Sequence, residues 1–181
     1  CRGTHEGEDE WQIARFMCAH TIMLGLEGIP GVYIHSLLGT MNDIERVRNT
    51  GQNRSINRHR WEYNKLDTVL NNENSLHYII LDKMKTLINI RQQQSAFHPN
   101  ATQFTLQLGE HCFGYWRQSM DRAQSVFCIT NISKQEQFIR ISDVNLISTQ
   151  TWSDLLSNMV LAQDQQTLTL APYQTLWLTN R

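Results

Sequence analysis

Long apolar runs, a basic leader and an excess of charge of either sign are all missing from this sequence. No segment approaches the roughly 18–20 consecutive apolar residues that a membrane-spanning helix needs. The first residues are polar and acidic, unlike the basic and then apolar start of a secretory signal. The net charge of -1 over 181 residues gives no overall attraction to nucleic acid or to an anionic membrane. We therefore expect a cytoplasmic protein with no membrane or nucleic-acid partner.

Closely spaced cysteines are also missing. The four cysteines, Cys1, Cys18, Cys112 and Cys128, are far apart, and no two of them form a Cys-x-x-Cys pair. Structural zinc sites need clustered ligands, so the sequence predicts no metal site, and we expect no cofactor. Cys18 and Cys128 stand in apolar stretches, which predicts that both are small buried hydrophobic residues.

The first half of the chain begins with a helix and a short apolar run. Apolar side chains recur at helical spacing over residues 11–26, and Gly28 and Pro30 follow, which predicts a buried helix that ends there. Residues 29–38 are short, apolar and rich in β-branched side chains, which predicts a buried parallel strand.

A polar stretch and a second helix complete this half. Residues 39–74 are rich in Asn and Arg and predict a long loop, and loops of such length are often functional. Ser75 then stands at the N-cap position of a helix whose apolar stripe continues to Arg91.

From Phe97 onward the period of the apolar residues falls to two. Such alternation, broken by turn residues, predicts a small antiparallel β-sandwich. The expected strands lie at residues 104–108, 113–115, 125–131, 137–141, 167–171 and 173–179. The change of period predicts two domains, at residues 1–96 and 97–181.

The expected fold class is therefore α/β plus all-β, and its first part is incomplete. A single parallel strand cannot form a sheet, because it needs hydrogen-bonding neighbours. Either the first part forms a homodimer or a rearranged packing, or its partner strands precede Cys1. The second explanation is favoured.

Several segments resemble the α-amylase family of glycoside hydrolases. GIPGVY at residues 28–33, followed by Asn42-Asp43, resembles that family's last barrel strand and the N-D that follows it. WSDLL at 152–156 and LTLAPY at 168–173 are similar to the end of its C-terminal β domain. The resemblance implies the last helix-strand-helix portion of a TIM (β/α)8 barrel, followed by an antiparallel β-sandwich C-terminal domain. The portion comprises helix seven, strand eight, a long loop and helix eight.

Two further segments resemble the sucrose phosphorylase branch of that family. HSLLGTMND spans residues 35–43, and TGQNRSINRHR spans residues 50–60. The branch carries G-R-x-I-N-R after strand eight, and this pattern falls on Arg54, Ile56, Asn57 and Arg58, with Asn53 in place of the glycine. The His-Ser pair at 35–36 is similar to relatives that act on glucosylglycerate or sucrose 6-phosphate.

The branch resemblance implies a retaining glucoside phosphorylase. Such an enzyme transfers glucosyl from sucrose, sucrose 6-phosphate or glucosylglycerate to inorganic phosphate and releases glucose 1-phosphate. It uses an aspartate nucleophile, a glutamate acid/base and a third carboxylate. In the barrel these follow strands four, five and seven, so the resemblance places all three before Cys1. We expect this chain by itself to be inactive, with sugar and phosphate as the partners of the longer enzyme.

The resemblance also suggests which residues bind the acceptor. A phosphorylase needs fixed cations near the anomeric carbon, and arginine holds phosphate through two parallel hydrogen bonds. By resemblance, Arg54 reaches the phosphate or acceptor subsite, and Asn57 and Arg58 orient the loop or contact the acceptor. His35, at the end of the predicted strand, is a further candidate contact.

Structural roles are the alternative for the same residues. The arginines can be solvated, or paired with nearby carboxylates, which are those of Asp43, Glu45 and Glu62. His35 can equally be a hydrogen-bonded structural histidine, and Tyr33 is predicted to be a packing residue.

Other function classes stay open. An α-amylase-type hydrolase or glucosyltransferase would make the arginine-rich loop only structural. A non-catalytic carbohydrate-binding β module would need an exposed row of aromatic residues, but Trp116, Trp152, Tyr173 and Trp177 are spread over different strands. Nucleic-acid binding would need basic and aromatic residues interleaved on a sheet, and the arginines gather on one loop instead.

Overall fold

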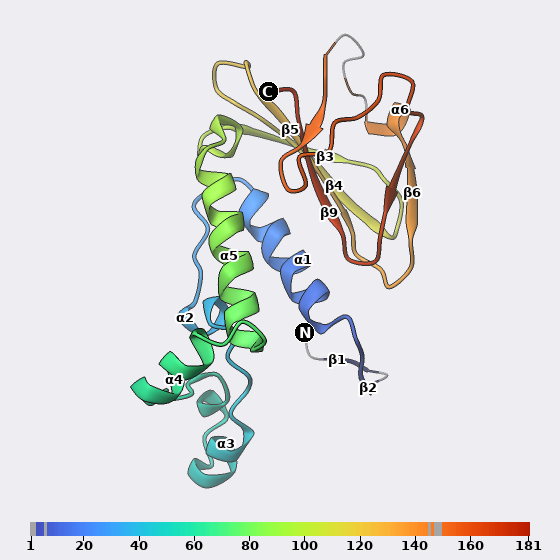
Figure 1. Cartoon of the computed structure of the whole chain (residues 1–181). Helices are drawn as coiled ribbons and strands as arrows, with labels where there is room; N and C mark the ends of the chain where they lie inside the picture. The colour runs from blue at the N-terminus through green and yellow to red at the C-terminus, as the bar shows by residue number, and fades with distance from the viewer. Residues whose placement is uncertain (1–2, 6, 145, 147–149) are drawn as a thin grey trace. The chain divides into compact units, whose positions relative to one another are not determined.

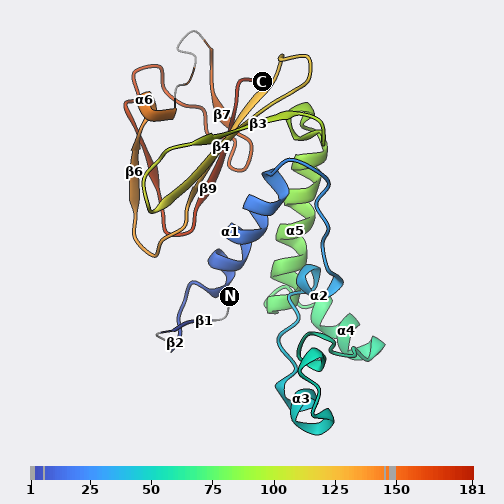
Figure 2. The ribbon, with the colours of Figure 1, turned by 180° about the vertical axis from the view of Figure 1, so that it is seen from behind.

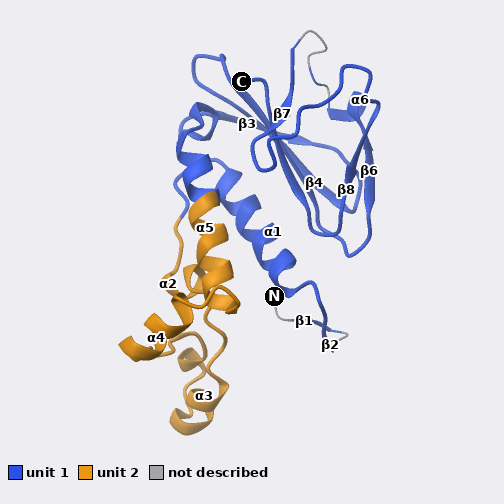
Figure 3. Ribbon diagram, viewed as in Figure 1, with its two compact units in different colours: residues 1–30, 87–181 blue, residues 31–86 orange. Residues whose placement is uncertain are grey.

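The structure is a computed structural model, and it describes residues 3–5, 7–144, 146 and 150–181. It contains two compact units (Figures 1 and 3). Unit 1 is formed by residues 1–30 and 87–181, and unit 2 by residues 31–86. Cys1 lies outside the described residues, so the prediction for it stays a prediction.

Unit 1 holds two antiparallel sheets that form separate layers (Figures 1 and 2). The larger sheet has the order β3-β4-β5-β9-β7, with these strands at Thr102–Leu106, Cys112–Gln118, Ser125–Asn131, Thr175–Thr179 and Ser153–Asp154. The smaller sheet pairs β6 (Gln137–Arg140) with β8 (Thr167–Leu170), and the short helix α6 (Ile141–Val144) follows β6. A separate pair, β1 (Gly3–Thr4) and β2 (Gly7–Glu8), precedes the first helix.

The hydrophobic core of unit 1 lies between these two sheets. Phe127 of β5 pairs in register with Leu178 of β9, and both side chains belong to one buried cluster. Ile139 of β6 and Leu168 and Leu170 of β8 complete the cluster from the smaller sheet. Each such side chain contributes roughly 1.5–3 kcal/mol when it leaves water. Along β8 exposed and buried residues alternate, which confirms the antiparallel β architecture that the period of two predicted.

Helix α1 (Gln12–Gly25) confirms the first predicted helix. The Asp9 carboxylate lies before it, accepts a hydrogen bond from the Trp11 N–H at 3.0 Å and pairs with Arg15 at 2.6 Å. At the other end, a Cβ atom on Gly25 would lie only 2.1 Å from the hydroxyl of Tyr115. Glycine at this position therefore permits the close approach of α1 to the sheet.

Two arginines, Arg117 and Arg91, hold the carbonyl groups at the end of α1. Arg117 is 0% exposed and donates to the Gly25 carbonyl at 2.8 Å and to the His98 carbonyl at 2.9 Å. Arg91 donates to the Leu24 carbonyl at 2.7 Å. A cation suits this position because the last carbonyls of a helix carry partial negative charge.

Helix α5 (Leu76–Gln92) confirms the second predicted helix. It is followed by the 3-10 turn η2 (Ser95–Phe97), which leads to β3. The Ser75 hydroxyl accepts a hydrogen bond from the Tyr78 N–H at 3.0 Å, so Ser75 caps the helix as predicted.

The strand predicted over residues 29–38 is not formed, and that prediction is wrong for this chain. Residues 29–33 have no regular secondary structure, and Ile34–Leu37 form the short helix α2. Ile29 is 85% exposed. A strand exists only where a neighbouring strand exchanges hydrogen bonds with it, and no described residues pair with this segment.

The segment predicted as a long loop, residues 39–74, contains three helical elements instead. These are α3 (Ile44–Thr50), the 3-10 turn η1 (Asn53–Asn57) and α4 (Tyr63–Leu70). Neither α3 nor α4 has a buried residue. Without a buried apolar stripe, such short helices leave no periodicity for sequence analysis to detect.

Cys18, Cys112 and Cys128 are buried free thiols, which confirms the prediction for Cys18 and Cys128. Burial raises the pKa of the Cys18 thiol to about 11. Within the described ranges, no three His, Cys, Asp or Glu side chains come together as metal ligands. None of the described helices has the length and apolar character needed to cross a bilayer.

Candidate functional site

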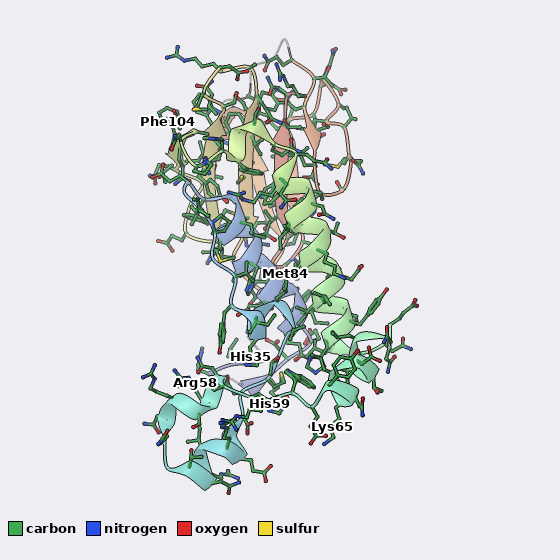
Figure 4. The ribbon with its side chains drawn as sticks, turned by 90° about the vertical axis from the view of Figure 1, so that its left-hand side faces the viewer. His35, Arg58, His59, Lys65, Met84 and Phe104 are labelled. Atoms are coloured by element: carbon green, nitrogen blue, oxygen red, sulfur yellow. The ribbon has the colours of Figure 1, made fainter. Side chains whose placement is uncertain are left out.

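Three of the four predicted site residues line one open hollow in unit 2. The hollow has a volume of about 550 Å³, and its lining is Tyr33, Asn53, Arg54, Ile56, Asn57 and Arg58. The turn η1 explains why they meet: at three residues per 3-10 turn, Arg54 and Asn57 fall on the same side. Ser55, between them, is buried. Figure 4 labels Arg58 together with His35 and His59.

None of the described residues neutralises the positive charge on this hollow. Arg54 and Arg58 are exposed, and neither side chain has a hydrogen bond or ion pair with any described residue. Two carboxylates that were candidates to pair with them are engaged elsewhere. Asp43 binds His59 at 2.9 Å, and Glu62 binds Lys65 at 3.0 Å. Two free guanidinium groups beside one hollow can hold an anion.

Tyr33 has a role beyond the packing that was predicted for it. Its side chain lines the hollow and is 49% exposed. Its hydroxyl donates to the carbonyl of Asn57 at 3.0 Å. The backbone of Asn57 is therefore held, while its side chain stays open to the hollow. A tyrosine inside an apolar run gives no sign of this contact in the sequence.

His35 is placed differently from the other three predicted residues. It is half-buried, and its Nδ1 lies 3.2 Å from the Thr40 hydroxyl. Its ring packs edge-on against Tyr33 at 5.2 Å. Thr40 also accepts a hydrogen bond from the Trp61 indole at 3.0 Å. His35 thus belongs to an internal polar network of unit 2 and is not part of the lining of the hollow.

Asp43 organises the backbone on which this loop is built. Its carboxylate accepts hydrogen bonds from the Arg46 N–H and from His59 Nδ1, both at 2.9 Å. The His59 hydrogen bond, followed by the Arg46 N–H, holds the pKa of Asp43 below its ordinary value of 3.8. The charged form is therefore stabilised. Sequence analysis considered Asp43 only as part of the N-D motif and as a partner for arginine.

Comparison with curated proteins relates the chain to phosphorylases. Glucosylglycerate phosphorylase of Spirochaeta thermophila is 33% identical over 173 residues, which cover 91% of this chain and 30% of that protein. The Escherichia coli protein of the same name is 30% identical, covering 96% of this chain and 29% of that protein. The chain is homologous to part of these phosphorylases. It spans about 30% of their length, and no family model matches it.

The match to sucrose phosphorylases is shorter. Sucrose phosphorylase of Agrobacterium vitis is 34% identical over 83 residues, or 46% of this chain and 16% of that protein. The comparisons confirm the resemblance to sucrose phosphorylase-like enzymes that the motifs suggested.

Solved α-amylase structures share the fold. The α-amylase of Geobacillus thermoleovorans, complexed with acarbose, matches with a TM-score of 0.70 and 17% identity over 93% of this chain and 33% of that one. AmyP E221Q, in complex with maltotriose, gives a TM-score of 0.76 and 14% identity over 96% of this chain and 36% of that one. At such low identity these structures show the fold alone.

Proposed function

We propose that this chain is the C-terminal part of a retaining glucoside phosphorylase whose donor is glucosylglycerate. The support is the extent of the matches. Relatives named glucosylglycerate phosphorylase align with 91% and 96% of this chain, whereas a sucrose phosphorylase and a sucrose 6(F)-phosphate phosphorylase each align with 46%. Sucrose and sucrose 6-phosphate are the alternative donors.

The domain boundaries predicted from the sequence belong to the same proposal. Residues 1–96 would end a TIM barrel, and residues 97–181 would form the C-terminal β domain. In the longer enzyme, residues 29–33 would find the neighbouring strands that a parallel strand needs. The exposure of Ile29 and Ile34, at 85% and 53%, fits a segment that pairs with residues outside this chain.

The chemistry proposed for the longer enzyme has two displacements. A carboxylate outside the 181 residues attacks the anomeric carbon, the glucosyl–oxygen bond of the donor breaks, and glycerate leaves with a proton from the acid/base carboxyl group. A phosphate oxygen then attacks the same carbon, the bond to the carboxylate breaks, and glucose 1-phosphate leaves. In this proposal Arg54 and Arg58 bind phosphate during the second displacement, with Asn57 as a neutral hydrogen-bonding partner.

The uncompensated pair of arginines is the observation that carries this assignment. Arginines that hold the interior of the fold are paired with carbonyl groups, as Arg117 is. Arg54 and Arg58 have no such partner among the described residues, and both line the same hollow. The arrangement supports an anionic ligand, and phosphate is the anion that the proposed reaction supplies.

The test is the ratio of phosphorolysis to hydrolysis in the full-length protein that carries this sequence. We expect Arg54→Ala to slow phosphorolysis about ten- to a hundred-fold, because a charge-assisted hydrogen bond is worth about 1.5–3 kcal/mol. Hydrolysis by water needs no cation and should be largely retained. Arg54→Lys should restore only part of the loss, because an ammonium group cannot make the bidentate contact.

Arg48→Ala is the matched control, because Arg48 is an exposed arginine of α3 that does not line the hollow. It should leave the ratio unchanged. An equal loss of phosphorolysis and hydrolysis in Arg54→Ala would assign Arg54 to the fold or the donor site. Turnover that is independent of phosphate in the unaltered protein would favour an α-amylase-type hydrolase instead.

A further inference from the structure

We infer that Tyr33, Asp43 and Arg46 are positioning residues that fix the backbone of residues 56–58 and thereby hold the arginines of the hollow in place. The inference rests on the proposed function of that hollow. It adds three residues outside the G-R-x-I-N-R pattern, and two of them, Asp43 and Arg46, do not line the hollow.

Three consecutive carbonyl groups carry the inference. Each accepts a hydrogen bond from a donor elsewhere in unit 2. The Asp43 N–H donates to the Ile56 carbonyl at 2.7 Å, the Tyr33 hydroxyl to the Asn57 carbonyl at 3.0 Å, and Arg46 Nη1 to the Arg58 carbonyl at 2.8 Å. We call this set of three hydrogen bonds the carbonyl clamp.

The donors of the carbonyl clamp are themselves held. Asp43 and Arg46 belong to the first turn of α3, where the Asp43 carboxylate accepts from the Arg46 N–H. At the other end of α3, the Thr50 hydroxyl donates to the hydroxyl of the buried Ser55 at 3.1 Å. Both ends of α3 therefore make hydrogen bonds that hold the turn η1 and its C-cap residue.

Two physical consequences favour phosphate binding. A fixed backbone leaves less motion to be lost when phosphate orders the guanidinium groups, so binding costs less entropy. The clamp also engages three carbonyl oxygens that would repel an anion if they faced it. Arg46 lies in the same basic segment as Arg54, but its Nη1 donates to the Arg58 carbonyl and its side chain does not line the hollow. It acts through the backbone and is not a phosphate contact.

Two substitutions test the clamp, each with a matched control in unit 2. Tyr33→Phe removes one clamp hydrogen bond without a change of charge, and Tyr63→Phe is its control because Tyr63 is 80% exposed in α4. Arg46→Met removes the donor to the Arg58 carbonyl. Arg48→Met removes the same charge from the same helix, and the Arg48 side chain makes no hydrogen bond with the described residues.

Two readouts are measured in the full-length protein. The first is hydrogen–deuterium exchange of the Ser55 and Arg58 amides. The Ser55 amide donates to the carbonyl of Gln52, and the Arg58 amide donates to the carbonyl of Ser55. The second is KM for inorganic phosphate against kcat. We expect each clamp variant to speed exchange and to raise KM for phosphate about three- to ten-fold, the size of one lost hydrogen bond. The controls should change neither quantity.

The outcomes separate the inference from the function on which it rests. Unchanged exchange in both clamp variants would overturn the inference. Equal rises of KM in Arg46→Met and Arg48→Met would also overturn it, because charge and not position would then matter. Faster exchange with an unchanged KM for phosphate would refute the assignment of phosphate to this hollow instead.

Discussion

At the scale of single residues, the arginines of this chain divide by what accepts their hydrogen bonds. Arg117 and Arg91 donate to backbone carbonyls at the end of α1. Arg46 donates to a carbonyl of the clamp. Arg54 and Arg58 have no acceptor among the described residues and line the hollow. Of these five arginines, only Arg54 and Arg58 keep a guanidinium group available for an anion.

Arg117 offers a stability prediction at this scale. Its two nitrogens Nη1 and Nη2 satisfy carbonyls of Gly25, His98 and Ala101 in the interior of unit 1. Arg117→Met would leave these acceptors buried and unpaired, at a cost of about 1–3 kcal/mol for each that water cannot reach. We expect the free energy of unfolding to fall by about 3 kcal/mol or more, measured by urea denaturation followed by tryptophan fluorescence.

Arg140→Met is the matched control, because Arg140 is 77% exposed and pairs with Asp143 on the surface. Such pairs are worth about 0–1 kcal/mol, so this variant should change stability little. A loss in Arg117→Met no larger than in the control would show that water replaces the guanidinium.

At the scale of elements, α3 and η1 act together although neither has a hydrophobic core of its own. Their order comes from polar contacts: the cap at Asp43, the clamp on residues 56–58, and the αL residue Gly51 (φ 66°) between them. The cap is the contact that depends on protonation, because its acceptor is the Asp43 carboxylate. The two elements should therefore respond to pH in a way that the sandwich core does not.

Asp43 sets the direction of that response. Its pKa is lowered, mainly by the His59 hydrogen bond, so its contribution to stability is present above the ordinary value of 3.8. The contribution is lost as the pH falls through the native value, which lies below 3.8. We expect an NMR titration of the Asp43 carboxyl carbon to show a midpoint below 3.8.

Two histidine variants test whether the His59 hydrogen bond lowers the pKa of Asp43. His59→Phe removes the donor and should move the midpoint of Asp43 up toward 3.8. His77→Phe should not, because His77 Nδ1 bonds the Leu38 carbonyl at 2.7 Å and not Asp43. A midpoint that stays the same in His59→Phe would assign the lowered pKa to the Arg46 N–H instead.

At the scale of the whole molecule, the two halves of the sequence differ in how far they bury their apolar side chains. The β-sandwich closes its core with its own residues, from Phe127 on one sheet to Leu170 on the other. The segment over residues 29–34 leaves Ile29, Tyr33 and Ile34 exposed. The first arrangement needs nothing further, whereas the second presents apolar side chains for which the described residues provide no cover.

Activity is the prediction that belongs to this scale. Because the proposed carboxylates lie outside the 181 residues, we expect the purified chain to release no glucose 1-phosphate from glucosylglycerate, sucrose or sucrose 6-phosphate. The full-length protein under the same conditions is the positive control. Turnover that follows the chain through purification would show that the chain holds its own nucleophile and would contradict the proposal.

Part of the candidate site could be predicted from the sequence, and part could not. The motif over residues 50–60 pointed to Arg54, Asn57 and Arg58, and the structure places these three on one hollow. It did not point to Tyr33, which is distant in sequence and reaches the site only through its hydroxyl. Nor did it place His35, whose neighbours are set by the turn of α2.

The sandwich could be predicted from local pattern alone, because alternating apolar residues fix which face of each strand is buried, wherever its partner lies. The same holds for helices α1 and α5, whose apolar stripes and caps are local features. Only the tertiary structure decided the state of residues 29–38 and of α3, η1 and α4. A strand needs a partner that its own residues cannot specify. Short polar helices are held by contacts such as the carbonyl clamp, which join residues that no local pattern connects.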